Sequence, residues 1–223
     1  SPLRDVYKRQ LLKLNQQVRW MIFALWRWLS RKGQIRVNNL FNKKTYQLER
    51  NLKAAVPLIL LISLVIDSAL PTLFPKAFIG QNQTIISHLV VYYIIAFAFY
   101  LRNSYIQLYA LVFGLIADSY NTTLLGIYTV LYFLLAHFIL MIRKYFPRNA
   151  VIHFMLFIVS ITVIDWLVYF FYLRVGYTDL SLTEYILTRL GPTLIFNTAL
   201  SFFMYLPTRG LLRWLGYDDH IIF

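Results

Sequence analysis

After residue 53 the chain alternates between long apolar segments and short polar connections. A membrane-spanning helix needs about 20 mainly apolar residues to cross about 30 Å of hydrocarbon. Six segments fit this pattern well enough to predict spanning helices: 54–73, 85–101, 104–117, 124–142, 150–173 and 185–206. The third has only 14 residues and reaches about 21 Å at 1.5 Å per residue. It therefore either crosses with sheltered ends or re-enters the same side.

The basic residues of the connections favour six crossings. With the N-terminus inside, the outer connections hold Lys76 and Arg174. The inner connections hold the other eight basic residues that flank the spans, namely Arg50, Lys53, Arg102, Arg143, Lys144, Arg148, Arg209 and Arg213. Cytoplasmic loops are enriched in Lys and Arg, whereas a re-entrant third segment would move three of these residues outside. The predicted fold is an all-α polytopic membrane protein with six transmembrane helices and both termini cytoplasmic.

The composition agrees with a membrane protein. Hydrophobic residues make up 59% of the 223 residues and charged residues only 14%, compared with about a quarter in soluble domains. The net charge of +13 is concentrated in residues 1–53, which hold 13 basic and 2 acidic residues, whereas residues 54–223 hold 9 and 7. A basic segment beside a membrane domain is attracted to an anionic leaflet. Membrane lipid is thus the expected partner of the tail, and nucleic acid is not required.

Two regions follow from this division: a basic N-terminal tail at 1–53 and a six-helix transmembrane domain at 54–223. The tail starts with SPLRDVYKRQ and has no initiator Met. This decapeptide resembles translated sequencing-adapter tags, so we expect residues 1–10 to be an artefact outside the fold.

Four charged side chains are predicted within the outer half of the spans: Asp67, Asp118, Asp165 and Arg189. Charged residues in spans usually face the bundle interior and pair with one another. Asp165 and Arg189 are the favoured pair, because adjacent antiparallel helices bring them to similar depth. Asn197, two turns further along the last span, would extend this polar network. The network is either a structural clamp between helices or a ligand or proton site.

A second polar feature lies where the third and fourth segments meet. Asp118 and Ser119 open an acidic, hydroxyl-rich turn at 118–123 that contains no Lys or Arg. Gly114 precedes Asp118 by one helical turn, and Gly126 follows the turn. A carboxylate at the mouth of a span is costly unless something uses or satisfies it. We therefore expect function to gather around this segment, 113–128.

The sequence offers no candidate for catalysis or for metal binding. There is no cysteine, so thiolate zinc sites and cysteine nucleophiles are excluded. The four histidines are scattered at positions 88, 137, 153 and 220, and no phosphate loop or hydrolase motif is present. We predict that the protein is not an enzyme and holds no metal or cofactor.

With these features, residues 50–215 resemble the MreD family of bacterial rod shape-determining proteins. The resemblance rests on GLIADSYNTTLLGIY, on Asp165 in the fifth span, and on Asn197 before a basic end at Arg209 and Arg213. The long tail before residue 50 departs from the family, whose members begin close to their first span.

The resemblance implies a non-enzymatic, multi-pass subunit of the cell-elongation machinery in the bacterial plasma membrane. Such subunits scaffold peptidoglycan synthesis with MreC-like proteins, with MreB where it is present, with a RodA-type glycosyltransferase and with a class B penicillin-binding protein. Carried over to this chain, the family-like motif positions are Gly114, Asp118, Ser119 and Gly126.

A second function remains open at the level of sequence. The family's fold also resembles the substrate-binding subunits of vitamin uptake transporters. In that alternative, Asp67, Asp118, Asp165 and Arg189 would line an outward-facing pocket for a small molecule.

Overall fold

The computed structural model describes residues 54–80, 83–101, 105–121 and 126–215. The predicted tail at 1–53 lies outside these residues. Within the described part the chain is all-helical and has no strand, only an isolated bridge between Ile79 and Thr84. The helices are Ala54–Leu73, α2 (Pro75–Phe78), α3 (Leu89–Tyr100), α4 (Ile106–Asn121), α5 (Ile127–Ile142), α6 (Ala150–Val175), α7 (Leu182–Tyr185), the π-helical turn η1 (Ile186–Leu190) and α8 (Gly191–Trp214). The all-α fold class is confirmed.

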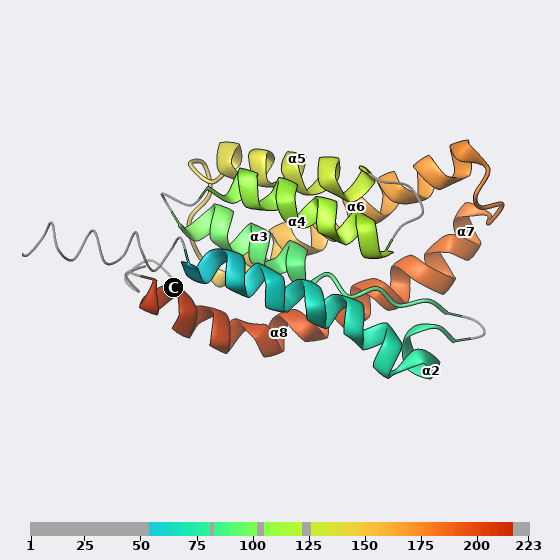
Figure 1. Cartoon of the computed structure of the whole chain (residues 1–223), viewed down its shortest axis with the longest axis horizontal. Helices are drawn as coiled ribbons and strands as arrows, with labels where there is room; N and C mark the ends of the chain where they lie inside the picture. The colour runs from blue at the N-terminus through green and yellow to red at the C-terminus, as the bar shows by residue number, and fades with distance from the viewer. Residues whose placement is uncertain (1–53, 81–82, 102–104, 122–125, 216–223) are drawn as a thin grey trace, which may run out of the picture. The chain divides into compact units, whose positions relative to one another are not determined.

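Each predicted span corresponds to one main helix, but the helices differ in length. Ala54–Leu73, with 20 residues, and α6, with 26, are long and apolar enough to cross a membrane by themselves. The helices α3, α4 and α5 have only 12 to 16 residues. The α7, η1 and α8 segments follow one another directly and make the last helical stretch of the bundle (Figure 1).

Three predicted boundaries are wrong. The last span, predicted to end at residue 206, continues as α8 to Trp214. The span predicted at 85–101 is not helical at its start, because α3 begins at Leu89 and residues 85–87 form no helix. The span predicted to end at residue 117 continues as α4 to Asn121. Asp118 and Ser119 therefore belong to the last turn of a helix and not to the connecting turn.

The α3 helix is the centre of the bundle. All twelve of its residues are buried, with at most 8% of any residue exposed. It contacts α4, α5, α6 and α8, and Figure 1 shows it enclosed between these helices. Its sequence, LVVYYIIAFAFY, is apolar on every face, as expected for a helix that is surrounded by protein.

Charged side chains from other helices satisfy both ends of α3. The carboxylate of Asp67 accepts hydrogen bonds from the backbone N–H groups of Leu89 and Val90, each at 2.9 Å. At the other end, Arg143 donates from Nη1 to the carbonyl oxygens of Ala98 at 3.0 Å and Leu101 at 2.8 Å. A negative charge at the N-terminus and a positive charge at the C-terminus both complement the helix dipole.

The helices α4 and α5 pack more closely at Gly114 than a residue with a side chain would allow. A Cβ atom placed on Gly114 would lie 2.5 Å from the Cα of Thr129 and 3.0 Å from the carbonyl oxygen of Tyr128. Both neighbours are backbone atoms, so no side-chain rotation can relieve the contact. Only glycine at position 114 permits this approach of the two helices.

Replacing Gly114 by alanine is expected to destabilise the bundle by about 1–3 kcal/mol, because the two helices must separate to admit the methyl group. The matched control is Gly210→Ala. Gly210 lies inside α8 with no atom within 4 Å of an added Cβ, and alanine favours a helix over glycine by about 0.5–1 kcal/mol. Thermal unfolding in an uncharged detergent should show a lower melting temperature for Gly114→Ala alone. Equal melting temperatures for the two variants would contradict the close approach.

Candidate functional site

Polar side chains gather at one end of the bundle, which we call the α7 end. It comprises α2, the segment 84–88, the last turn of α4, the start of α5, and η1 with α7 (Figure 1). The sequence-predicted residues Asp67, Asp118, Asp165 and Arg189 all belong to this end or border it.

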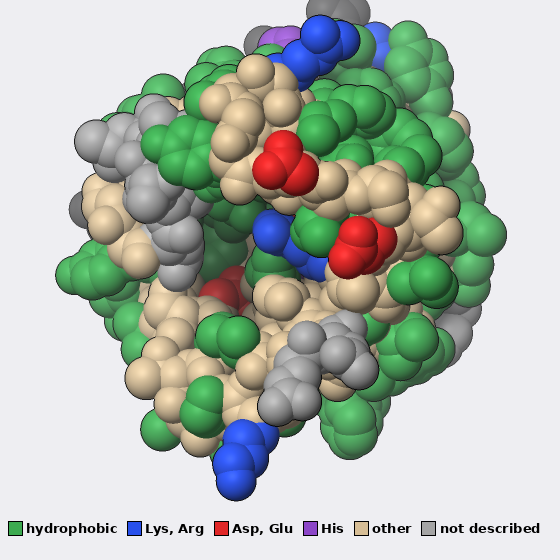
Figure 2. All heavy atoms as spheres, turned by 90° about the vertical axis from the view of Figure 1, so that its right-hand side faces the viewer, with side chains coloured by type: hydrophobic (Ala, Val, Ile, Leu, Met, Phe, Trp, Pro, Cys, Tyr) green, Lys and Arg blue, Asp and Glu red, His purple; other side chains and the backbone are tan. Residues whose placement is uncertain are grey.

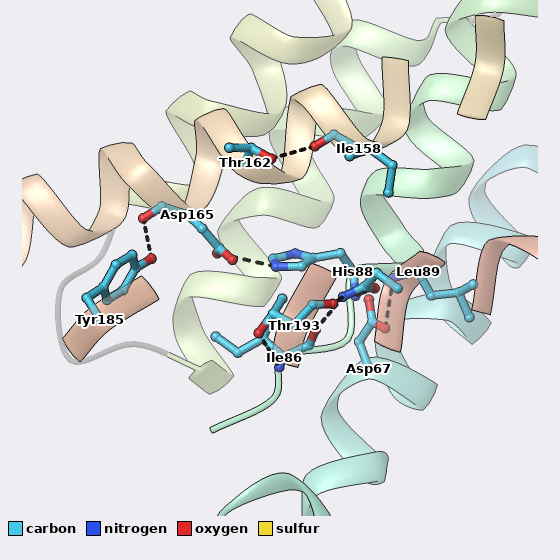
Figure 3. A network of polar contacts seen from close by, with 10 residues as sticks. Asp67, Ile86, His88, Leu89, Ile158, Thr162, Asp165, Tyr185 and Thr193 are labelled. Carbon is cyan, nitrogen blue, oxygen red and sulfur yellow. Dashed lines mark hydrogen bonds and ion pairs between the residues drawn. The ribbon is translucent and has the colours of Figure 1, made fainter. Parts of the chain in front are cut away.

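Asp67 is a structural cap for α3. Besides the N–H groups of Leu89 and Val90, its carboxylate accepts a hydrogen bond from the hydroxyl of Ser87. Figure 3 shows this carboxylate below the start of α3, where His88 is the N-cap residue but gives no side-chain cap of its own. An aspartate from the preceding helix thus does what an N-cap side chain would do.

The segment 84–88 runs without helical structure into the apolar bundle, and α8 satisfies its backbone. Asn197 accepts from the N–H of His88 at 2.8 Å and donates to the carbonyl of Ile86 at 2.7 Å. The hydroxyl of Thr193 accepts from the N–H of Ile86 at 3.2 Å. Non-helical backbone is tolerated at membrane depth only where protein supplies such partners. Asn197, which was predicted to extend a charged network, serves the backbone of this segment.

Asp118 repeats the same arrangement in the next hairpin. It is fully buried, and its carboxylate accepts from the N–H groups of Gly126 at 3.0 Å, Tyr128 at 2.9 Å and Thr129 at 2.9 Å. The hydroxyl of Thr129 adds a fourth bond at 2.7 Å. Asp118 therefore caps α5 from α4, and its charge is held inside the protein.

Of the other two motif positions, Gly126 belongs to this cap and Ser119 does not. Gly126 is the N-cap residue of α5 and has φ of +110°, a left-handed conformation that favours glycine. Ser119 is exposed and donates to the carbonyl of Leu115 within its own helix at 2.8 Å. Gly114, Asp118 and Gly126 thus join α4 to α5, whereas the contact of Ser119 stays within α4.

Asp165 is not paired with Arg189 as expected. No ion pair within 4.0 Å joins them, and Asp165 Oδ1 lies 3.3 Å from His88 Nε2. Both side chains are buried, with 0% and 2% exposed, and Figure 3 shows the carboxylate reaching from α6 toward the imidazole. The contact lacks hydrogen-bond alignment, so it is an electrostatic one, and becomes an ion pair when His88 is protonated.

His88 is the site residue that the sequence analysis missed. It had been grouped with three scattered histidines, although its position near the start of the second span matched the depth predicted for Asp165. The missing information was which helices are neighbours. α3 packs against α6, and this contact brings His88 to Asp165.

Arg189 forms no ion pair with any of these carboxylates. It belongs to η1 and lies over the ring of Tyr185, with 5.9 Å from its Cζ to the ring centroid. Its Nε is buried without a hydrogen-bond partner, and no ion pair joins Arg189 to any residue that the structure describes. A single π-helical turn such as η1 is frequently found at functional sites.

Arg189 lines a cavity of about 300 Å³ at the α7 end. Asp67 and His88 border the same cavity, together with the aromatic side chains Tyr128 and Tyr132. Figure 2, which faces this end, shows a hollow with both acidic and basic side chains inside it. The volume is at the lower end of the range for small-molecule sites. No group of three metal-ligating side chains occurs among the described residues.

The family model described as rod shape-determining protein MreD matches residues 49–215. No curated protein and no solved structure matches the chain.

The Asp118 cap gives a first prediction for this site. Asp118→Ala leaves three buried N–H groups without acceptors, so it is expected to lower the free energy of unfolding by about 3 kcal/mol or more. Asp118→Asn keeps one acceptor oxygen and is expected to be intermediate. The control, Asp179→Ala, removes an exposed carboxylate and should change stability by less than about 0.5 kcal/mol. Unfolding monitored by circular dichroism in detergent measures all three, and wild-type stability of Asp118→Ala would refute the cap.

The contact between His88 and Asp165 gives a second prediction. His88→Ala and Asp165→Ala are each expected to destabilise the protein, and the double variant should lose less than the sum. The difference is expected to be about 1–3 kcal/mol, because residues in direct contact are not additive. The control cycle combines His88→Ala with Asp179→Ala, which should be additive. Additivity in both cycles would show that the His88–Asp165 contact carries no energy.

Proposed function

The chain belongs to the MreD family of rod shape-determining proteins, and we propose that it is a non-enzymatic scaffold subunit of the bacterial cell-elongation machinery. The family match carries this proposal, because residues 49–215 include every helix that the structure describes. The family places the protein in a membrane and in the control of cell shape. The internal caps of α3 and α5 support a rigid body whose polar groups are used to hold its own helices together.

In the proposed arrangement the six main helices cross the plasma membrane and both ends of the domain are cytoplasmic. The start of the helix Ala54–Leu73 and the end of α8 lie at the same end of the bundle, opposite the α7 end (Figure 1). The connection from α5 to α6 at that end holds Arg143, Lys144 and Arg148, whereas Asp179 precedes α7 and Glu184 lies in it. Basic residues mark cytoplasmic connections, so the α7 end faces outward. The short helices are sheltered by their neighbours, as the complete burial of α3 illustrates.

The partners proposed for this scaffold are an MreC-like protein, a RodA-type glycosyltransferase, a class B penicillin-binding protein, and MreB where it is present. Partner proteins do not dock on the carboxylate of Asp118 in this arrangement, because that group is buried inside the bundle. Exposed apolar helix faces are the surfaces offered to lipid and partners. On α8, for example, Phe202, Phe203 and Leu206 are 68%, 77% and 71% exposed.

Depletion of the protein in its host tests this function. We expect the cells to lose their rod shape and become round or swollen, and the tagged protein extracted in mild detergent to carry an MreC-like protein with it. Complementation with wild type and with Asp179→Ala should restore cell width, whereas Asp118→Ala should restore it poorly. Unchanged cell shape after depletion would overturn the proposal.

The orientation has its own test, made simple by the absence of cysteine from the chain. We expect Tyr177→Cys, beyond the end of α6, to react with a membrane-impermeant maleimide in intact cells. Tyr145→Cys should react only after the cells are opened. Both tyrosines are well exposed, at 59% and 73%, so the comparison depends on membrane side. Labelling of residue 145 in intact cells would show that the orientation is reversed or that the chain does not make six crossings.

A further inference from the structure

The cavity at the α7 end is lined by a guanidinium that forms no ion pair within the described residues. Arg189 lines the cavity, and no carboxylate of the described residues lies within ion-pair distance of it. Arg189 is half-buried and its Nε has no hydrogen-bond partner, and a guanidinium held partly inside an apolar bundle is stabilised by a counter-charge. An anion bound in the cavity would therefore be stabilised by the charge of Arg189.

Neither neighbouring aspartate can supply that anion. The carboxylate of Asp67 is occupied by two backbone N–H groups and the hydroxyl of Ser87. The carboxylate of Asp165 faces His88 at 3.3 Å. Moving either group to Arg189 would strip the cap from α3 or leave His88 without its partner.

Other hydrogen-bond donors converge on the same cavity. The hydroxyl-bearing residues Tyr128, Tyr132 and Tyr172 line it, and Thr84 lies at its border. No hydrogen bond of the three tyrosine hydroxyls is found within the described part of the chain. The donors come from α5, α6 and η1, so they surround the cavity from separate elements. Arg189 and these hydroxyls together make a site for an oxygen-rich anion.

We propose that this cavity binds a phosphate group that pairs with Arg189. A phosphate group presents at least two strong acceptor oxygens, which match the planar guanidinium fork and keep lone pairs for the tyrosine hydroxyls. The rest of the lining includes aliphatic side chains such as Leu64, Ile79 and Ile85, beside the polar residues Asp67, Ser87 and His88. Such a wall accommodates an apolar body attached to the phosphate. An anionic phospholipid head group and a free phosphate are the two sources of this chemistry.

The test uses the purified full chain in an uncharged maltoside detergent and measures its melting temperature with three probes. Dihexanoyl phosphatidylglycerol carries the phosphate on short acyl chains, dihexanoylglycerol has the same chains without phosphate, and inorganic phosphate has no chains. We expect phosphatidylglycerol to raise the melting temperature by a few degrees and dihexanoylglycerol to leave it unchanged. A rise with inorganic phosphate at comparable concentration would identify free phosphate as the source, and a rise with phosphatidylglycerol alone would identify the lipid.

The variants show whether Arg189 is responsible. Arg189→Gln should weaken the response to the phosphate-bearing probe at least about tenfold in concentration, and Arg189→Lys should weaken it less because the charge remains. The control, Arg174→Gln, removes an exposed basic residue in the last turn of α6 at the same end and should respond like wild type.

Three results would overturn the proposal: no rise with either phosphate probe, an equal rise with dihexanoylglycerol, or an undiminished rise in Arg189→Gln. If Arg189→Gln does not fold, the wild-type comparison of the two lipids and the response of Arg189→Lys decide the question. The proposal does not depend on the scaffold function, since binding is measured on the isolated protein and cell shape in the depleted host.

Discussion

A helix that is enclosed on all sides has no water to satisfy its ends, and α3 is such a helix. Its first N–H groups and last C=O groups would be costly if left without partners in an apolar bundle. Asp67 and Arg143 meet this demand from two different helices. The central helix is therefore fixed in register by charges at both ends, and the helices around it are positioned by the same bonds. Much of the polar chemistry of this protein follows from that requirement.

Three of the main helices, Ala54–Leu73, α4 and α6, each carry one aspartate, but they use it in two ways. Asp67 and Asp118 cap the helix that follows in the chain, so each joins the two members of a hairpin. Asp165 caps nothing and contacts His88, the N-cap residue of α3. The third hairpin is thereby attached to the first one. A bundle of three hairpins held by three carboxylates needs few polar residues elsewhere, which agrees with its low content of charged residues.

The apolar segments made the helices predictable from the sequence, because long runs such as 150–173 permit little else in a membrane protein. The importance of Asp118, Gly114 and Gly126 was also visible, since a carboxylate between glycines at a span end requires a partner. The role of the Asp118 carboxylate was not visible, because its hydrogen-bond donors are backbone N–H groups that any sequence possesses. The expected pairing of Asp165 with Arg189 was wrong because charge and depth alone were considered. The partner of Asp165 depends on which helices pack together. Because α6 packs against α3, that partner is His88 at the start of α3.

The cap on α3 also bears on how the protein is assembled in the membrane. The N–H groups at the start of α3 find their acceptor on Asp67, which is synthesised about twenty residues earlier. Neither helix satisfies its polar group without the other, since a bare carboxylate and bare amides are both disfavoured in lipid. The two helices should thus leave the insertion machinery together, as one hairpin, and the Asp118 pair should do the same. The positions of these two carboxylates therefore imply that the helices are inserted into the membrane in pairs.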